Sequence, residues 1–279
     1  MSRPEQIGEK LFTPSDYHTE GSRRCAVSWL RLLPPATIRF YAGIFYTVLQ
    51  ARGIARKGRY DAEQLTLSSE FSSRLAEWCG GQLHVTGMEN LYRNPGAAVI
   101  VGNHMSTLET FLLPGIIGPA KKLGFVVKES LLTHPIFGDV MRAVPHIAVG
   151  RDNPRQDLQT VMEKGAEFLK NGVSFCIFPQ ATRSGTFDES KFNTLGVKLA
   201  RRAGVPVIPL AMKTDFWGNG RLFKDVGRIR AKEPIRIAFG PEIPTTLPQA
   251  EVHGRVVEFV RANLREWGVS CIKGGEKEG

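Results

Sequence analysis

Residues 97–110 read AAVIVGNHMSTLET, an apolar run followed by a turn and then by a helical pattern. The run at 97–101 predicts a buried strand, and the pattern at 107–118 predicts a helix. A histidine, His104, lies in the turn between them. Because α/β proteins collect binding and catalytic side chains at the carboxyl ends of their strands, this turn is the first candidate for a functional site.

The same alternation of apolar strands and helices continues along the chain from residue 83 onward. Runs that predict strands lie at 83–87, 97–101, 123–127, 146–149, 173–179 and 205–212, with a further strand pair at 227–231 and 235–240. Runs that predict helices lie at 107–118, where Pro114 should cause a kink or an early end, and at 154–170, 192–204 and 249–267. Fully apolar strands separated by helices are typical of parallel sheets covered on both faces. We therefore expect an α/β fold, with a mainly parallel central sheet flanked by helices and an N-terminal helical extension.

His104 and Glu109 are candidates for a catalytic pair, but their spacing leaves a second interpretation open. In a continuous helix five residues turn through about 140° beyond one full turn, so the two side chains meet only if the turn brings His104 back. A histidine held by a carboxylate can serve as a general base. The same stretch fits a capping box, with Ser106 as N-cap and Glu109 as third helical residue. The stretch by itself favours neither interpretation.

Residues 22–57 differ in composition from the rest of the chain. Two helical patterns flank Pro34 and Pro35, and the second combines aromatic and aliphatic side chains with basic residues at both ends. Such a helix can lie in a membrane interface, and it can equally pack on the protein's own core. The basic flanks favour the membrane slightly.

The chain is basic, with 37 Lys and Arg against 27 Asp and Glu and a net charge of +10 over 279 residues. This excess suggests an anionic partner, and since no nucleic-acid-binding pattern is present we expect a membrane surface or a phosphorylated substrate. The four cysteines lie far apart, which is typical of reduced thiols, and no Cys or His spacing predicts a metal site. Neither a secretory signal nor an apolar stretch of roughly 18 residues is found.

Four blocks of the sequence, taken in order, resemble the glycerolipid acyltransferases, the family of 1-acylglycerol-3-phosphate acyltransferases. They are NHMSTLE at 103–109, VVKESLLTHPIFGDVMRAVPHIAVGR at 126–151, FPQATRS at 178–184 and VPVIP at 205–209. The family patterns that they resemble are N-H-x-x-x-x-D, then Lys-x-x-Leu with Pro-x-x-Gly and a closing Arg, then F-P-E-G-T-R-S, and finally V-P-x-x-P. This chain departs from them by having Glu109 for Asp, Gln180 for Glu, Ala181 for Gly, and Gly150 where Asp often stands.

The resemblance implies an O-acyltransferase that moves a fatty acyl group from a thioester to a hydroxyl of a lysophospholipid such as 1-acylglycerol-3-phosphate. His104 would remove the hydroxyl proton, and Glu109 would orient His104. The resemblance also implies a set of substrate-binding residues, namely Arg183, Ser184, Thr182, Gln180, Arg151, Lys128 and Asn103. The cationic side chains among them would bind the phosphate of the acceptor. Acyl-CoA or acyl-[acyl-carrier protein] would be the donor, with no bound cofactor and no metal.

Two other functions stay open: transfer to a different lipid acceptor, of lipid A or aminolipid type, and a non-catalytic lipid-binding role, which Gln180 and Ala181 would allow.

We expect a polar N-terminus at 1–21, a helical, membrane-interfacial segment at 22–60, an acyltransferase α/β domain at 61–270 and a disordered tail at 271–279. The expected partners are a membrane phospholipid surface, the lysophospholipid and the acyl thioester or acyl-carrier protein. The expected location is the cytoplasmic face of a membrane, as a peripheral or monotopic protein.

Overall fold

The computed structural model describes residues 11–20, 35–180, 182–220 and 226–273. Its centre is an eight-stranded sheet in the order β1-β2-β9-β8-β3-β6-β4-β5. These strands are β1 (Tyr17–His18), β2 (Leu83–Thr86), β3 (Val99–Gly102), β4 (Leu123–Lys128), β5 (His146–Val149), β6 (Ser174–Ile177), β8 (Val207–Lys213) and β9 (Ile235–Phe239). Strands β8, β3, β6, β4 and β5 are parallel, and β9 is antiparallel to β8. The predicted α/β fold with a mainly parallel sheet is confirmed.

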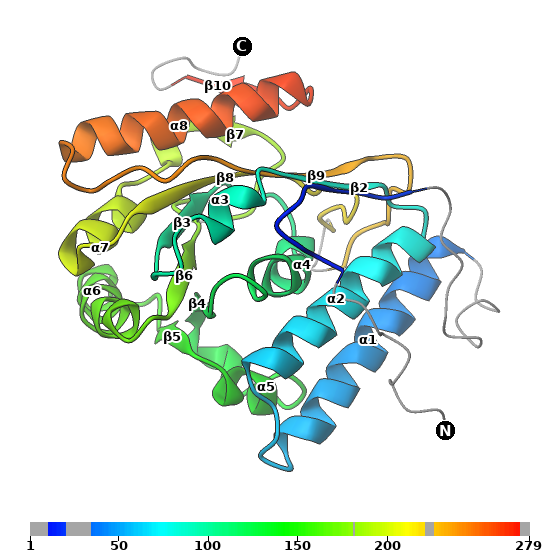
Figure 1. Cartoon of the computed structure of the whole chain (residues 1–279). Helices are drawn as coiled ribbons and strands as arrows, with labels where there is room; N and C mark the ends of the chain where they lie inside the picture. The colour runs from blue at the N-terminus through cyan, green and yellow to red at the C-terminus, as the bar shows by residue number, and fades with distance from the viewer. Residues whose placement is uncertain (1–10, 21–34, 181, 221–225, 274–279) are drawn as a thin grey trace.

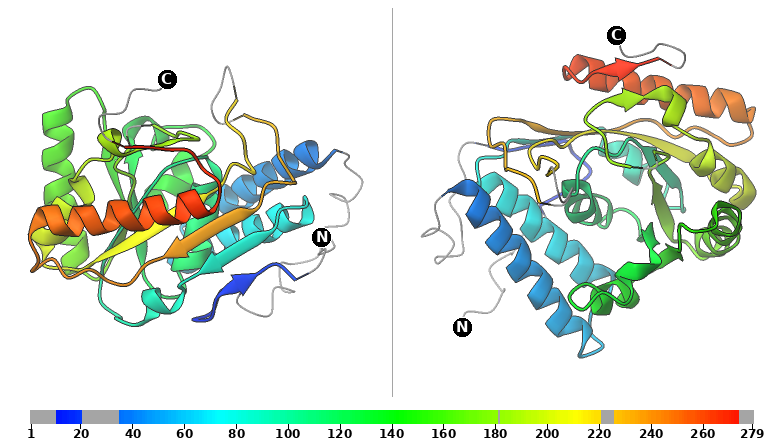
Figure 2. Two further views of the ribbon diagram at one scale, coloured as in Figure 1. Left: turned by 90° about the horizontal axis from the view of Figure 1, so that it is seen from above. Right: turned by 180° about the vertical axis from the view of Figure 1, so that it is seen from behind.

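Helices cover both faces of this sheet (Figures 1 and 2). They are α1 (Ala36–Ala55), α2 (Ala62–Trp78), α3 (Glu89–Tyr92), α4 (Leu108–Ile117), α5 (Gly138–Ala143), α6 (Pro154–Lys170), α7 (Leu195–Ala203) and α8 (Gln249–Glu266). On one face lie α6, α7 and α8. On the other, α4 lies nearest to the sheet, α2 covers α4, and α1 is outermost (Figure 1).

The alternation of side chains along the central strands supplies a separate core on each face. In β3, Val99 and Val101 pack with the α6–α8 side, whereas Ile100 packs with the α4 side. Successive side chains of a strand point to opposite faces, so a strand between two helical layers must be apolar throughout. This is why the uninterrupted apolar runs predicted parallel strands correctly.

Helix α4 continues through Pro114 to Ile117, so the early end expected at the proline does not occur. A serine of α2 compensates for the disturbed backbone: Ser69 Oγ donates to the carbonyl of Phe111 at 2.6 Å and accepts the N–H of Gly115 at 2.6 Å. A Cβ on Gly115 would lie 2.9 Å from the backbone nitrogen of Glu70. The close contact of α2 with α4 therefore requires glycine at 115, and it satisfies the backbone groups around the proline.

Helix α1 is the second of the two helical patterns predicted in residues 22–57, and the first falls outside the described residues. Its inner face packs on the domain, where the fully buried ring of Phe40 contacts Phe216 and Trp217, with centroids 5.7 and 5.0 Å apart. Its outer face leaves Ile38 and Phe45 about half exposed. The helix thus covers the core and also presents apolar side chains to the outside. No helix in the described ranges is long and apolar enough to cross a membrane.

Helix α2 was not predicted, because its buried face is made largely of small polar side chains. Ser69, Ser72 and Ser73 are buried, and the hydroxyls of Ser72 and Ser73 bond the carbonyls one turn back along the helix. An apolar periodicity, which is the main sequence signal of a helix, is therefore weak here.

The predicted strand pair at 227–231 and 235–240 is wrong. Only the second segment forms a strand, and both edges of that strand, β9, are occupied by β2 and β8. Ile229 makes an isolated bridge with Trp217 instead. At the carboxyl end, Cys271–Ile272, which we expected in a disordered tail, forms β10 and pairs in parallel with β7 (Phe187–Asp188).

Candidate active site

Five parallel strands end at the same edge of the sheet, and the segments that follow them supply the candidate residues. The turn with His104 follows β3, the segment 178–184 follows β6, and Lys128 ends β4. Arg151 comes two residues after β5, and Thr214 comes directly after β8. Residues that lie far apart in the sequence can therefore form one site.

The turn after β3 brings His104 and Glu109 together. His104 Nδ1 is hydrogen-bonded to Glu109 Oε2. The side chain of Glu109 is completely buried, whereas that of His104 is 19% exposed. The imidazole also stacks on the ring of Phe178, with centroids 4.4 Å apart and planes 6° from parallel. The histidine is thus held in one orientation and remains partly exposed.

The second carboxylate oxygen of Glu109 accepts backbone N–H groups just before α4. Oε1 accepts the backbone N–H groups of Met105 at 2.8 Å and Ser106 at 2.9 Å. In return, Ser106 Oγ accepts the N–H of Leu108 at 3.2 Å. The structure has Thr107, not Ser106, as the N-cap of α4, so the expected capping box is formed only in part. Pairing with His104 and bonding to this turn are not alternatives, since one carboxylate uses a different oxygen for each.

The segment after β6 fixes the backbone of the histidine. Gln180 Oε1 accepts the N–H of His104 at 2.8 Å, and the N–H of Ser184 donates to the His104 carbonyl at 3.0 Å. An amide oxygen is sufficient for the first of these bonds. Gln180 can therefore stand where the resembling family has a glutamate without loss of this contact.

The bond to Glu109 determines which nitrogen of His104 is basic. Because a carboxylate only accepts hydrogen bonds, Nδ1 carries the proton. Nε2 is then left with a lone pair that can take a proton from a bound alcohol or water. The geometry is that of a general base with an orienting acid.

The other predicted residues lie at or near this edge in different surroundings. Arg183 Nη1 contacts the hydroxyl of Thr107, at the start of α4. Arg151 has a left-handed backbone, with φ of 71°, and its N–H donates to Asp157 Oδ2 at 2.8 Å. Lys128 lies opposite Val149 in the β4–β5 register and is exposed.

Three of the predicted substrate-binding residues have roles within the protein itself. Asn103 is buried, and its amide donates to the carbonyl and accepts the N–H of Met212, both at 2.8 Å, which joins β3 to β8. Gln180 is engaged with His104, as described above. Ser184 Oγ accepts the N–H of Thr186 at 3.1 Å. Whether these side chains or Thr182 also contact a substrate stays a prediction.

Sequence reasoning missed Thr214, which supports the carboxylate from the neighbouring strand. It is fully buried, and its Oγ1 donates to Glu109 Oε1 at 2.6 Å. Its carbonyl accepts the hydroxyl of Ser106 at 2.9 Å. The signal in the sequence is a polar residue directly after strand β8.

Cys176 lies in β6 and is buried. Burial raises the pKa of its thiol, and the negative charge of Glu109 raises it further. The thiol is therefore protonated at neutral pH and is not a candidate nucleophile. Among the residues that the structure describes, no group of three or more His, Cys, Asp or Glu is placed to hold a metal ion.

Comparisons with known proteins identify the family of this chain. The family model described as acyltransferase matches residues 82–213. A 1-acyl-sn-glycerol-3-phosphate acyltransferase of Pseudomonas aeruginosa is 30% identical in an alignment of 242 residues that covers 80% of this chain and 90% of that protein. The chain belongs to the glycerolipid acyltransferase family. The Escherichia coli enzyme of the same name is 30% identical over 119 residues, covering 43% of this chain and 48% of that one.

A solved structure extends the likeness of this acyltransferase to the fold. The crystal structure of a 1-acyl-sn-glycerophosphate acyltransferase from Thermotoga maritima aligns with a TM-score of 0.65 over 88% of this chain and 97% of that chain. The two are 21% identical, so this match shows the fold alone. Of the four motif blocks of the acyltransferase, three contribute side chains to the edge described above, and the fourth builds the start of β8.

Proposed function

We propose that this acyltransferase moves a fatty acyl group from an acyl thioester to a hydroxyl of a lysophospholipid such as 1-acylglycerol-3-phosphate. The His104–Glu109 pair carries the proposal, because Nε2 of the oriented imidazole is the basic group that such a transfer needs. The name of the P. aeruginosa relative supports this choice of acceptor.

The proposed reaction uses His104 twice. Nε2 removes the proton of the acceptor hydroxyl while the oxygen attacks the thioester carbonyl, and Glu109 stabilises the imidazolium that forms. The tetrahedral intermediate then collapses to the ester and expels the thiolate, which takes the proton back from His104. Thr214 and the N–H groups of Met105 and Ser106 hold Glu109 in position throughout.

The substrate pair can be identified directly. Purified protein is incubated with acyl-CoA or acyl-[acyl-carrier protein] and a panel of lysolipids, including an aminolipid and a lipid A precursor, and the products are identified by mass spectrometry. We expect acylated 1-acylglycerol-3-phosphate and release of thiol that depends on both the acceptor and His104. Release of no thiol with any acceptor would favour the non-catalytic alternative.

We also propose that Arg183 binds the phosphate of the acceptor, with Arg151 and Lys128 supplying further positive charge. Replacing Arg183 by lysine keeps the charge and removes the bidentate hydrogen-bonding geometry of a guanidinium. We expect the acceptor KM to rise about tenfold, with the donor KM nearly unchanged. Steady-state kinetics with each substrate varied in turn provide the measurement, and an unchanged acceptor KM would assign Arg183 to supporting Thr107 instead.

The outer face of α1 leads us to propose attachment to the cytoplasmic surface of a membrane. Ile38, Phe45 and Leu49 are 52%, 53% and 41% exposed, and they recur at a spacing that places them on one side of the helix. Leu67 of α2 is also exposed. Apolar side chains on one face of a helix in a strongly basic protein are typical of interfacial attachment.

Point substitutions test this attachment better than deletion of α1, since deletion would uncover Phe216 and Trp217. We expect Phe45→Ser with Leu49→Ser to reduce co-sedimentation with anionic vesicles about tenfold or more, because two apolar side chains leave the lipid. The matched control is Leu158→Ser on α6, which is 44% exposed on the opposite face of the sheet. Equal sedimentation of all three proteins would contradict the attachment through α1.

A further inference from the structure

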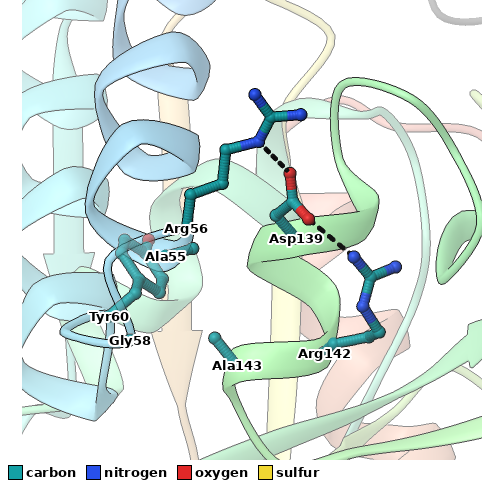
Figure 3. Close-up of a pocket in the computed structure, with 7 residues that line it drawn as sticks. All are labelled: Ala55, Arg56, Gly58, Tyr60, Asp139, Arg142 and Ala143. Atoms are coloured by element: carbon teal, nitrogen blue, oxygen red, sulfur yellow. Dashed lines mark hydrogen bonds and ion pairs between the residues drawn. The ribbon is translucent and has the colours of Figure 1, made fainter.

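A cluster of charged side chains lies where the end of α1 meets α5 (Figure 3). Asp139 of α5 is its centre: Oδ2 accepts Arg56 Nε at 3.0 Å and Arg52 Nε at 3.2 Å, and Oδ1 accepts Arg142 Nη2 at 2.6 Å. Next to these groups the surface is hollowed by a cavity of about 510 Å³. Its lining residues are Ala55, Arg56, Gly58, Tyr60, Asp139, Arg142 and Ala143.

The cluster has more positive charge than its carboxylate can balance. The hydrogen bond from Arg56 and the bond and charge of the neighbouring arginines lower the pKa of Asp139, so this side chain is ionised at neutral pH. Three guanidinium groups then face one carboxylate, which leaves a net charge of +2. A connection between α1 and α5 needs only one of these ion pairs, and exposed ion pairs contribute little to the stability of a fold.

The arginines of α1 also keep hydrogen-bonding capacity. Both use only Nε toward Asp139 in the contacts that the structure describes, so their terminal nitrogens remain available. The terminal nitrogens of Arg56 point away from the carboxylate (Figure 3). The side chains of Arg56 and Arg142 are 61% and 54% exposed. Arg142 already donates from Nη1 to the carbonyl of Leu132 and from Nη2 to Asp139, so it mainly adds charge. The terminal nitrogens of Arg56 and Arg52 supply the donors that match the oxygens of a phosphate.

The cluster also continues the apolar stripe on the outer face of α1. At about 100° per residue, Arg56 lies on the same side of the helix as Ile38, Phe45 and Leu49, and Arg52 lies next to them. The outer face of one helix thus changes, toward its carboxyl end, from apolar side chains to guanidinium groups. A ligand that joins hydrocarbon chains to a phosphate has the same order of groups.

We propose that Arg52, Arg56 and Arg142 bind the phosphate of an anionic phospholipid whose acyl chains lie along the outer face of α1. This site is separate from the acceptor site at His104, and it rests on the proposed membrane attachment, not on the acyl-transfer reaction. It would let the protein select anionic regions of a membrane.

The experiment compares vesicles of phosphatidylcholine with vesicles that also contain phosphatidylglycerol. For Arg56→Lys with Arg142→Lys, which keeps the charge, we expect affinity for the anionic vesicles to fall about tenfold and affinity for phosphatidylcholine to stay unchanged. Arg56→Gln with Arg142→Gln should lower the affinity for the anionic vesicles further. The matched control, Arg202→Gln with Arg255→Gln, removes two exposed arginines from α7 and α8 and should have a smaller effect.

The outcomes separate the site from the attachment itself. If the lysine double variant binds anionic vesicles as the wild type does, the attraction depends on charge alone and the phosphate site is wrong. If the wild type binds neither kind of vesicle, the membrane attachment fails and the site fails with it. If glycerol 3-phosphate binds the wild type and not the lysine variant in the absence of vesicles, the ligand is a soluble phosphate and the lipid assignment is wrong. Thermal unfolding and acyl transfer to a detergent-dispersed acceptor check that each variant is folded.

Discussion

Glu109→Gln is expected to lower kcat about a thousandfold or more while the protein stays folded. The reason lies in how the two carboxylate oxygens are used. Oε1 accepts three hydrogen bonds, from two backbone N–H groups and from the hydroxyl of Thr214. In the variant the amide oxygen must occupy this position, because an NH₂ group there would face donors. The amide nitrogen then faces His104 Nδ1.

A donor facing Nδ1 changes the tautomer of the imidazole. Nδ1 must accept, so the proton moves to Nε2, and Nε2 loses the lone pair that would take the acceptor's proton. The helix cap is kept, so circular dichroism should be unchanged. Glu109→Asp restores a carboxylate on a shorter side chain and should recover part of the rate.

Kinetics with saturating acceptor and thioester measure the effect, and the ¹⁵N chemical shifts of His104 report which nitrogen is protonated. A fully active Glu109→Gln variant would show that the carboxylate acts only as a cap. Normal activity together with a proton on Nε2 would exclude His104 as the base.

His104→Ala is expected to reduce acyl transfer about a thousandfold or more, which is the contribution of a positioned general base. The substitution also leaves Glu109 Oε2 buried without its partner, so we expect the melting temperature to fall. Loss of the ring opens a space beside Phe178. Imidazole added to the assay can enter this space, and we expect it to restore part of the rate.

Ser106→Ala is the matched control for this variant. It removes a hydroxyl that donates to Thr214 and accepts the N–H of Leu108 at the start of α4, and it should cost about 1 kcal/mol of stability with little loss of kcat. If Ser106→Ala were inactive and His104→Ala active, the hydroxyl would be the functional group, and the proposed mechanism would be wrong.

The sequence predicted those parts of the fold that depend on local pattern. Strands β3 to β6 and helix α6 were predicted within one or two residues, since their apolar periodicity and helix boundaries are local properties. The position of β9 was not predicted, because its partner β2 lies some 150 residues earlier and no local signal joins them. A strand's neighbours are set by the whole sheet.

The sequence predicted part of the candidate site, and the remaining part depended on contacts between distant segments. The pairing of His104 with Glu109 was permitted by their spacing but depended on the turn, and the double use of the carboxylate required knowing where each oxygen points. Thr214 was missed because it meets Glu109 only through the packing of β8 beside β3. Composition predicted an amphipathic α1, and the fold determined which side is buried.

The pairing of β2 with β9 also affects how the chain reaches its native state during synthesis. β2 emerges early from the ribosome, but the strand that joins it to the rest of the sheet is made only after β3 to β8. Pairings between such distant segments form slowly and leave intermediates with exposed apolar surface. The inner face of α1, with Phe40, has no Phe216 or Trp217 to cover it until the segment after β8 has been made, which is also late in translation. An apolar helix face that stays uncovered in a partly made chain favours aggregation.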